Sequence, residues 1–102
     1  MDLTQEQWAE RIETDPDAVI IDVRTEDEWN DGHIANATLL DIYQAENFLA
    51  GVESLDPDKH YYVYCKAGSR SAQACNIMSQ MGIRECYNLL GGFTGWKGPV
   101  AN

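Results

Sequence analysis

The residues with the clearest chemical potential lie in the stretch YYVYCKAGSRS, residues 61–71. Its aromatic and β-branched start predicts a strand that stops at Cys65, and a helical pattern resumes at Ser69. A loop that leads into a helix presents unpaired backbone N–H groups, and the helix dipole adds partial positive charge, so this position favours an anion. Lys66 and Arg70 add two cations. Because each of these influences lowers the thiol pKa, and the thiolate is the form that attacks, we predict that Cys65 is a nucleophile.

The alternative for Cys65 is a buried structural role, which is the commoner fate of a free cysteine. The charged neighbours Lys66 and Arg70 argue against burial. We therefore expect Cys65 to be a reactive side chain rather than a core side chain.

Cys75 and Cys86 are expected to be core residues, and the three cysteines together give no sign of a metal site. Cys65, Cys75 and Cys86 are an odd number without a C-x-x-C pair, which suits a reducing compartment better than a disulfide framework. They lack zinc-ligand spacing, and His33 and His60 do not complete a metal set with them. We expect no metal and no cofactor.

Length and composition indicate one globular domain over residues 1–102. Hydrophobic residues make up 44% of the chain and charged residues 24%, and no apolar run is long enough to cross a bilayer. The first residues, MDLTQEQWAERIE, are acidic and amphipathic, whereas a signal peptide is basic and then apolar. The sequence therefore predicts a cytoplasmic protein with no membrane partner.

Charge is distributed unevenly around a net value of −10. Sixteen of the seventeen acidic side chains lie in residues 1–58, and five of the seven lysines and arginines lie in residues 59–102, which include the cysteine loop. An acidic chain with a pI near 4.3 disfavours nucleic acid as a partner. A local cationic site on an acidic body instead suits a small anion, although most of the carboxylates are expected to be ordinary solvated surface groups.

Apolar strands and helical patterns alternate along the chain. Helices are expected from Thr4 to about Asp15, from Thr25 to Asn30, from Ala45 to Ala50 and from Ser69 to Gly82. The last of them should carry an apolar stripe formed by Ala72, Cys75, Met78 and Met81. Strands are expected over Ala18–Val23, Ala37–Leu40, Tyr61–Tyr64 and Ile83–Leu90. Such alternation implies parallel βαβ units. The fold class is therefore α/β, with an open, mostly parallel sheet covered by helices on both faces.

A second group of polar residues ends another strand. Asp22 and Arg24 are two residues apart, so they share one face of their strand, and ligands of open α/β sheets bind at the carboxyl ends of the strands. The pair could brace the cysteine loop or reach a ligand. A structural ion pair, in which Arg24 bonds loop carbonyls, is favoured over direct catalysis.

Three stretches of the sequence form a recognisable set: IDVRTEDEWNDGHIANA, CKAGSRS and LLGGFTGWKG, at residues 21–37, 65–71 and 89–98. Together they resemble the rhodanese (thiosulfate sulfurtransferase) family in its small single-domain form. The specific element is the Cys65-x-x-Gly68-x-Arg70-Ser71 loop. One departure is Asn36, where the family commonly has glycine, and this affects turn geometry rather than chemistry.

The resemblance implies a persulfide mechanism. Cys65 would take the outer sulfur of thiosulfate or of a persulfide and pass it to cyanide, to a thiol, or to a protein acceptor. The substrate-binding residues would be those of the loop, whose N–H groups would cradle the anion while Lys66 and Arg70 recognise an anionic donor: Lys66, Ala67, Gly68, Ser69, Arg70 and Ser71.

Other functions remain open. A cysteine phosphatase of related fold has five residues between Cys and Arg, whereas here there are four between Cys65 and Arg70, which suits a sulfur-sized group better than phosphate. A non-catalytic regulatory or sulfur-carrier domain is disfavoured by the presence of Cys65. A thioredoxin-like oxidoreductase would need a C-x-x-C pair.

Overall fold

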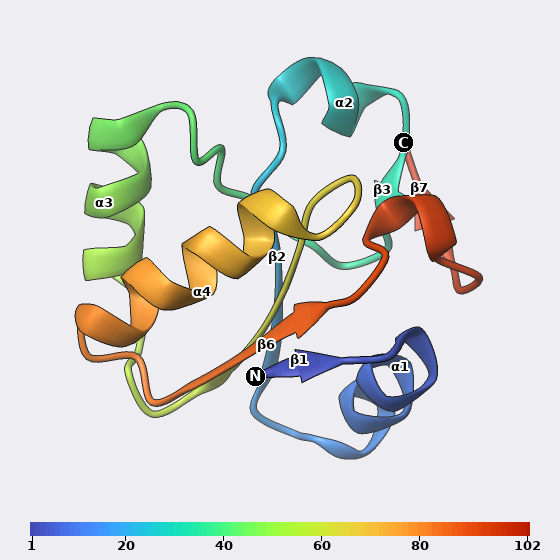
Figure 1. Cartoon of the computed structure of the whole chain (residues 1–102), viewed down its shortest axis with the longest axis horizontal. Helices are drawn as coiled ribbons and strands as arrows, with labels where there is room; N and C mark the ends of the chain where they lie inside the picture. The colour runs from blue at the N-terminus through green and yellow to red at the C-terminus, as the bar shows by residue number, and fades with distance from the viewer.

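Five short parallel strands form the centre of the molecule. The computed structural model describes residues 1–102, and Figure 1 shows the course of the whole chain. The sheet has the strand order β1-β6-β5-β2-β4. The strands of this sheet are β1 (Asp2–Leu3), β2 (Ala18–Asp22), β4 (Thr38–Leu39), β5 (His60–Tyr64) and β6 (Glu85–Leu89). A separate antiparallel pair joins β3 (His33–Ile34) to β7 (Val100–Ala101).

Four α-helices and one 3₁₀-helix connect the strands. They are α1 (Gln5–Thr14), α2 (Glu26–Asn30), α3 (Ala45–Glu53), α4 (Ser69–Gln80) and the 3₁₀-helix Phe93–Gly95. The first two helices begin with capping boxes, in which Thr4 pairs with Gln7 and Thr25 pairs with Glu28. No helix is long and apolar enough to cross a membrane.

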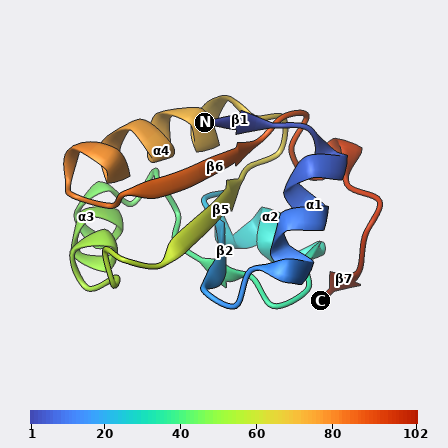
Figure 2. The ribbon, with the colours of Figure 1, turned by 90° about the horizontal axis from the view of Figure 1, so that it is seen from below.

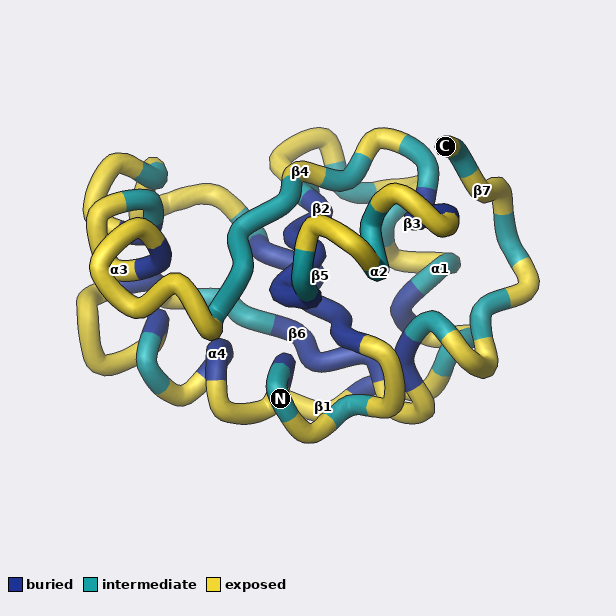
Figure 3. The backbone as a smooth tube through the Cα atoms, turned by 90° about the horizontal axis from the view of Figure 1, so that it is seen from above, coloured by how far each residue is buried: buried dark blue, intermediate teal, exposed yellow.

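Each face of the parallel sheet carries its own apolar cluster. On one face, α3 and α4 pack against alternate residues of β2 and β5, with Phe48 and Met78 fully buried. Helix α1 covers the other face (Figure 2). Its Trp8 is buried there against Tyr62 and Tyr64 of β5. The buried residues therefore concentrate along the central strands and the inner sides of the helices (Figure 3).

The α/β fold with helices on both faces confirms the sequence-based prediction, and the predicted elements differ mainly at their ends. The third helix continues beyond Ala50 to Glu53, and the last central strand begins at Glu85 rather than at Ile83. The short strands β1, β3 and β7 were not predicted, because two-residue strands carry no periodic pattern.

The predicted apolar stripe of α4 is wrong in two positions. Ala72 and Met81 are exposed, and the helix instead buries Ser71, Ala74, Cys75 and Met78. A polar residue, Ser71, belongs to the buried face because it serves the cysteine loop, so hydropathy alone misplaced the face.

Asn36 adopts the conformation for which the family commonly uses glycine. Its φ is +70°, which asparagine tolerates better than other residues with side chains. The turn after β3 is thus kept despite the departure in sequence.

A polar cluster lies at the amino ends of the strands, away from Cys65. His60 is hydrogen-bonded through Nδ1 to Asp15 at 2.7 Å, its Nε2 lies 3.0 Å from a carboxylate oxygen of Glu85, and Tyr62 donates to Asp15 at 2.8 Å. With Asp17 nearby, the ligand atoms of Asp15, Asp17 and His60 lie within 4.8 Å of one another. The sequence did not indicate this group. Both nitrogens of His60 already face carboxylates, which is the environment of an imidazolium rather than of a neutral metal ligand.

We predict that His60→Gln lowers stability only in mildly acidic solution. The hydrogen bond to Asp15 raises the pKa of His60, so this stabilisation is complete below the ordinary histidine pKa of 6.5 and is lost as the pH rises through the raised value. Burial raises the pKa of Asp15, but the bonds from His60 and Tyr62 outweigh it and lower that pKa, so this contribution is complete above 3.8 and is lost as the pH falls further. Urea unfolding of both proteins should show the largest difference between these limits.

The matched control for this experiment is Lys59→Gln, which changes the exposed neighbour of His60. A stability difference between wild type and His60→Gln that is constant from pH 4 to pH 9 would contradict the ion-pair interpretation.

Candidate active site

Cys65 stands directly after β5, where the chain turns into a three-residue loop before α4. Gly68 closes this loop with φ +115°, a conformation that side chains rarely permit, and it precedes the first helical residue, Ser69. The glycine therefore sets the sharp entry into the helix and turns the loop N–H groups back toward the sulfur.

The sulfur of Cys65 lies beneath these donors. The N–H of Gly68 is 3.0 Å from Sγ, and the hydroxyl of Ser71, in the first turn of α4, is 3.3 Å from it. Cys65 is only 1% exposed, so the expectation that its charged neighbours would keep it out of the interior is wrong. Lys66 and Ala67 of the loop are exposed while Cys65 itself is buried. A charged neighbour in the sequence is therefore no evidence that the cysteine is exposed.

Hydrogen bonding makes this buried thiol acidic. Burial raises the pKa of Cys65, but the hydroxyl of Ser71 and the backbone N–H groups of Ser71, Gly68 and Ala67 outweigh burial, so the net pKa is lowered. The predicted cationic influence of Lys66 and Arg70 is not among these main causes. The backbone cradle and one hydroxyl therefore favour the thiolate.

Asn88 on β6 competes with Cys65 for the hydroxyl proton of Ser71. The Oγ of Ser71 lies 2.5 Å from Oδ1 of Asn88, 3.2 Å from the carbonyl of Gly68 and 3.3 Å from Sγ of Cys65. A hydroxyl has one proton to donate, so it serves one of these acceptors at a time. Nδ2 of Asn88 is held by Asp2 at 3.0 Å and by Gly68 at 3.3 Å, which keeps Oδ1 aimed at Ser71. A thiolate at Cys65 is the more strongly attracting acceptor, so ionisation of the sulfur favours the orientation in which the Ser71 hydroxyl donates to Sγ.

Arg70 is engaged by a carboxylate that the sequence did not connect with it. Its two terminal nitrogens bind both oxygens of Glu28 on α2, at 2.7 and 3.0 Å. This bond lowers the pKa of Glu28 to about 2 and raises that of Arg70. The guanidinium also lies 5.5 Å from the ring centre of Tyr43. The side chain is thus fixed in place with its charge balanced, whereas Lys66 is exposed.

The segment after β6 holds the loop from the side. Phe93 donates to the carbonyl of Cys65 at 2.8 Å, and Thr94 donates to the carbonyl of Lys66 through its N–H at 3.1 Å and its hydroxyl at 2.9 Å. A Cβ on Gly92 would lie 2.5 Å from the Lys66 carbonyl oxygen. Glycine is therefore required there for the close approach of the two segments.

Asp22 and Arg24 form a buried ion pair on the face of the sheet opposite α4. Nη2 of Arg24 is 2.8 Å from Asp22 and 2.8 Å from the carbonyl of Gly32, and the hydroxyl of Tyr64 donates to Asp22 at 2.6 Å. Arg24 also packs over the ring of Phe93 at 4.5 Å. Its carbonyl partner belongs to the segment before β3 rather than to the cysteine loop, so the ion pair supports the site through two neighbours, Phe93 and Tyr64, the residue that precedes Cys65.

The structure brings the predicted loop residues around one sulfur, and it adds Glu28, Asn88 and Thr94, which the sequence analysis missed. Glu28 belongs to the capping box of α2, and this helix-capping role gives no sign of a second role beside Arg70. Asn88 lies between Tyr87 and Leu89 in the buried part of its strand, which is a signal of a buried polar role. The groups around Sγ are hydrogen-bond donors, so the site suits an anion.

Comparisons with known proteins agree with one another. A model of the rhodanese-like domain family matches residues 4–99. The thiosulfate sulfurtransferase GlpE of Coxiella burnetii is 37% identical over 81 residues, which are 79% of this chain and 73% of that protein. A sulfurtransferase of Allochromatium vinosum is 28% identical over 95 residues, covering 93% of this chain and 86% of that protein.

Solved structures show the same likeness in three dimensions. The protein SSP1007 of Staphylococcus saprophyticus superposes with a TM-score of 0.84 at 26% identity, covering 99% of this chain and 98% of that one. The rhodanese-like domain of the Anabaena protein Alr3790 gives a TM-score of 0.86 at 28% identity, covering 99% and 78% respectively.

We predict that Ser71→Ala slows alkylation of Cys65 at neutral pH by about tenfold, because the thiolate loses a hydrogen bond to a charged acceptor of about 1.5 kcal/mol. The measurement is the rate of iodoacetamide labelling of Cys65 against pH, followed by peptide mass spectrometry, and the midpoint should move to higher pH. Ser69→Ala is the matched control, because Ser69 is an exposed serine of the same helical turn. Identical pH profiles for Ser71→Ala and wild type would show that the hydroxyl does not favour ionisation.

Proposed function

Because the chain belongs to the rhodanese-like domain family, we propose that it is a sulfurtransferase that carries a sulfane sulfur as a persulfide on Cys65. The observation that carries the proposal is the acidic thiol of Cys65 beneath the Gly68 N–H and the Ser71 hydroxyl. A thiolate in this position is a nucleophile, and the same donors suit the negative charge of a persulfide.

The proposed reaction has two displacements at sulfur. The thiolate of Cys65 attacks the outer sulfur of thiosulfate, the sulfur–sulfur bond of the donor breaks, and sulfite leaves with the electron pair. Cyanide or a thiolate then attacks the outer sulfur of the Cys65 persulfide, and the thiolate of Cys65 is restored. In both the free thiolate and the persulfide intermediate, the negative charge resides on sulfur near the loop, where fixed N–H donors favour it without rearrangement.

Access to the sulfur favours donors whose reactive atom is terminal. Cys65 lies at the bottom of the loop, and a lone sulfur at the end of thiosulfate or of a persulfide can reach it with less displacement of the loop than a branched phosphoryl group can. The exposed ammonium of Lys66 would attract an anionic donor at the mouth. The acceptor is proposed to be cyanide or a thiol, and a protein persulfide or thiol fits the same chemistry.

We predict that Cys65→Ser abolishes transfer of sulfur from thiosulfate to cyanide, because serine cannot form a persulfide. The measurement is thiocyanate formation at saturating thiosulfate, with Cys75→Ser as the matched control that retains Cys65. Turnover of Cys65→Ser at the wild-type rate would refute the proposal. A wild-type protein that accepts sulfur but releases no thiocyanate would instead support the sulfur-carrier alternative.

We predict different kinetic effects for the two loop cations. Lys66→Ala should raise KM for thiosulfate about two- to fivefold with little change in kcat, because an exposed charge contributes about 0.2–1 kcal/mol to attraction of an anion. Arg70→Ala should instead lower kcat and thermal stability, since it leaves Glu28 unpaired beside the loop.

Steady-state kinetics at low ionic strength measure both effects, and Lys59→Ala, at the opposite end of β5, is the control for net charge. An unchanged KM for Lys66→Ala would remove this lysine from donor recognition, and unchanged stability of Arg70→Ala would remove the positioning role of the Glu28 pair.

A further inference from the structure

Helix α4 and strand β6 face each other through two residue pairs at nearly equal spacing, Ser71 with Asn88 and Cys75 with Cys86. Ser71 and Cys75 are four residues apart on the helix, a rise of about 6 Å, and Asn88 and Cys86 are two residues apart on the strand, a rise of about 6.6 Å. The hydrogen bond of 2.5 Å from Ser71 to Asn88 fixes the first of these pairs. Because the helix runs antiparallel to the strand, the residue one turn further along the helix, Cys75, lies over the residue two positions earlier on the strand, Cys86.

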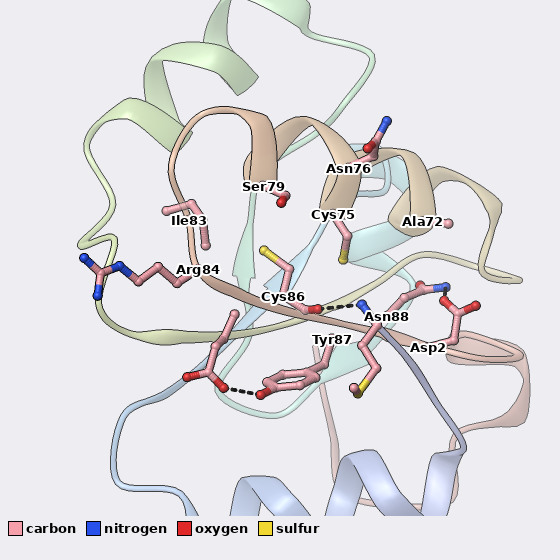
Figure 4. A pocket seen from close by; sticks show the side chains of 12 residues that line it. Asp2, Ala72, Cys75, Asn76, Ser79, Ile83, Arg84, Cys86, Tyr87 and Asn88 are labelled. Carbon is pink, nitrogen blue, oxygen red and sulfur yellow. Dashed lines mark hydrogen bonds between the residues drawn. The ribbon is translucent and has the colours of Figure 1, made fainter.

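The side chains confirm this pairing. Both thiols point into the space between α4 and β6 and line one pocket of about 550 Å³ (Figure 4). Beside Cys75, the helix lines this pocket with the small side chains of Ala72 and Ser79 and with Asn76. The pocket lies beyond Asn88 from the active site, so the two thiols are separate from the sulfur of Cys65.

The two cysteines differ in exposure and acidity. Cys75 is 7% exposed, whereas Cys86 is half-buried at the pocket wall. The proximity of the two thiols lowers the pKa of Cys86, and the same proximity together with burial raises the pKa of Cys75. An acidic, accessible thiol beside a shielded neutral one is the arrangement of an attacking and a resolving cysteine.

We propose that Cys75 and Cys86 are a redox pair that closes to a reversible disulfide when a hydroperoxide enters the pocket between α4 and β6. The thiolate of Cys86 attacks one oxygen of hydrogen peroxide, the O–O bond breaks, and the leaving hydroxide takes a proton to become water. Cys75 then attacks the sulfenic sulfur of Cys86, the S–O bond breaks, and the thiol proton of Cys75 leaves with the oxygen as a second water. The two sulfurs together lose two electrons, and the peroxide gains them.

Disulfide formation requires a modest approach of the two elements. Between its two Cβ atoms, the bridge from Ser71 to Asn88 contains three covalent bonds and one hydrogen bond, whereas a disulfide contains three covalent bonds and holds its Cβ atoms about 3.8 Å apart. Because the side chains of Ala72 and Ser79 are small, α4 has room to move closer to β6 near Cys75 and Cys86.

The test uses the full chain with Cys65→Ser, so that the nucleophile proposed for sulfur transfer cannot react and the result does not depend on that function. The protein is treated with a small excess of hydrogen peroxide at pH 7, and free thiols and non-reduced peptides are followed by mass spectrometry. We expect loss of both free thiols, a monomer that is lighter by two hydrogen atoms, and a peptide that joins Cys75 to Cys86. Dithiothreitol should restore both thiols.

Two further variants test the order of events in the same Cys65→Ser background. With Cys75→Ser added, the sulfenic acid should persist on Cys86 and be trapped there by dimedone; with Cys86→Ser added, Cys75 should remain unlabelled over the same time. Persistence of both thiols, a disulfide only between molecules, or irreversible oxidation of Cys86 without linkage to Cys75 would each overturn the proposal.

Discussion

The donors around Sγ of Cys65 are the constraint on which the rest of the site depends. A buried sulfur resists ionisation, yet the Gly68 N–H at 3.0 Å and the Ser71 hydroxyl at 3.3 Å reverse that tendency and lower the thiol pKa. The short loop after β5 serves this purpose, because only a chain that turns sharply at Gly68 can return its N–H groups to the residue three positions earlier. Charge on neighbouring side chains has a lesser part, since Arg70 is balanced by Glu28.

Elements distant in sequence keep this loop in shape. Phe93 and Thr94 bind the carbonyls of Cys65 and Lys66, and a side chain at Gly92 would prevent their approach. Asn88 positions Ser71 from the neighbouring strand. The proposed disulfide between Cys75 and Cys86 would form one helical turn further along the same interface, so a substitution that moves α4 over β6 is expected to affect both places.

The sequence was sufficient for the fold and for the cysteine loop because both depend on local patterns. Alternating apolar strands and helices predicted the parallel sheet, and the spacing from Cys65 to Ser71 predicted a cradle at a strand end. The exposure of Cys65 and the partner of Arg70 could not be predicted, since each depends on packing between elements far apart in the chain: Glu28 is 42 residues from Arg70. Asp22 and Arg24 were correctly placed on one face, but that face proved to be opposite α4, so they act on the loop through Tyr64 and Phe93 rather than by direct contact.

The central claim is that Cys65 carries a sulfur atom, and intact mass spectrometry after exposure to thiosulfate tests it most directly. The protein should gain the mass of one sulfur, the added sulfur should map to the peptide that contains Cys65, and addition of cyanide should remove it. Retention of the original mass, or sulfur found on Cys75 or Cys86 instead, would contradict the account.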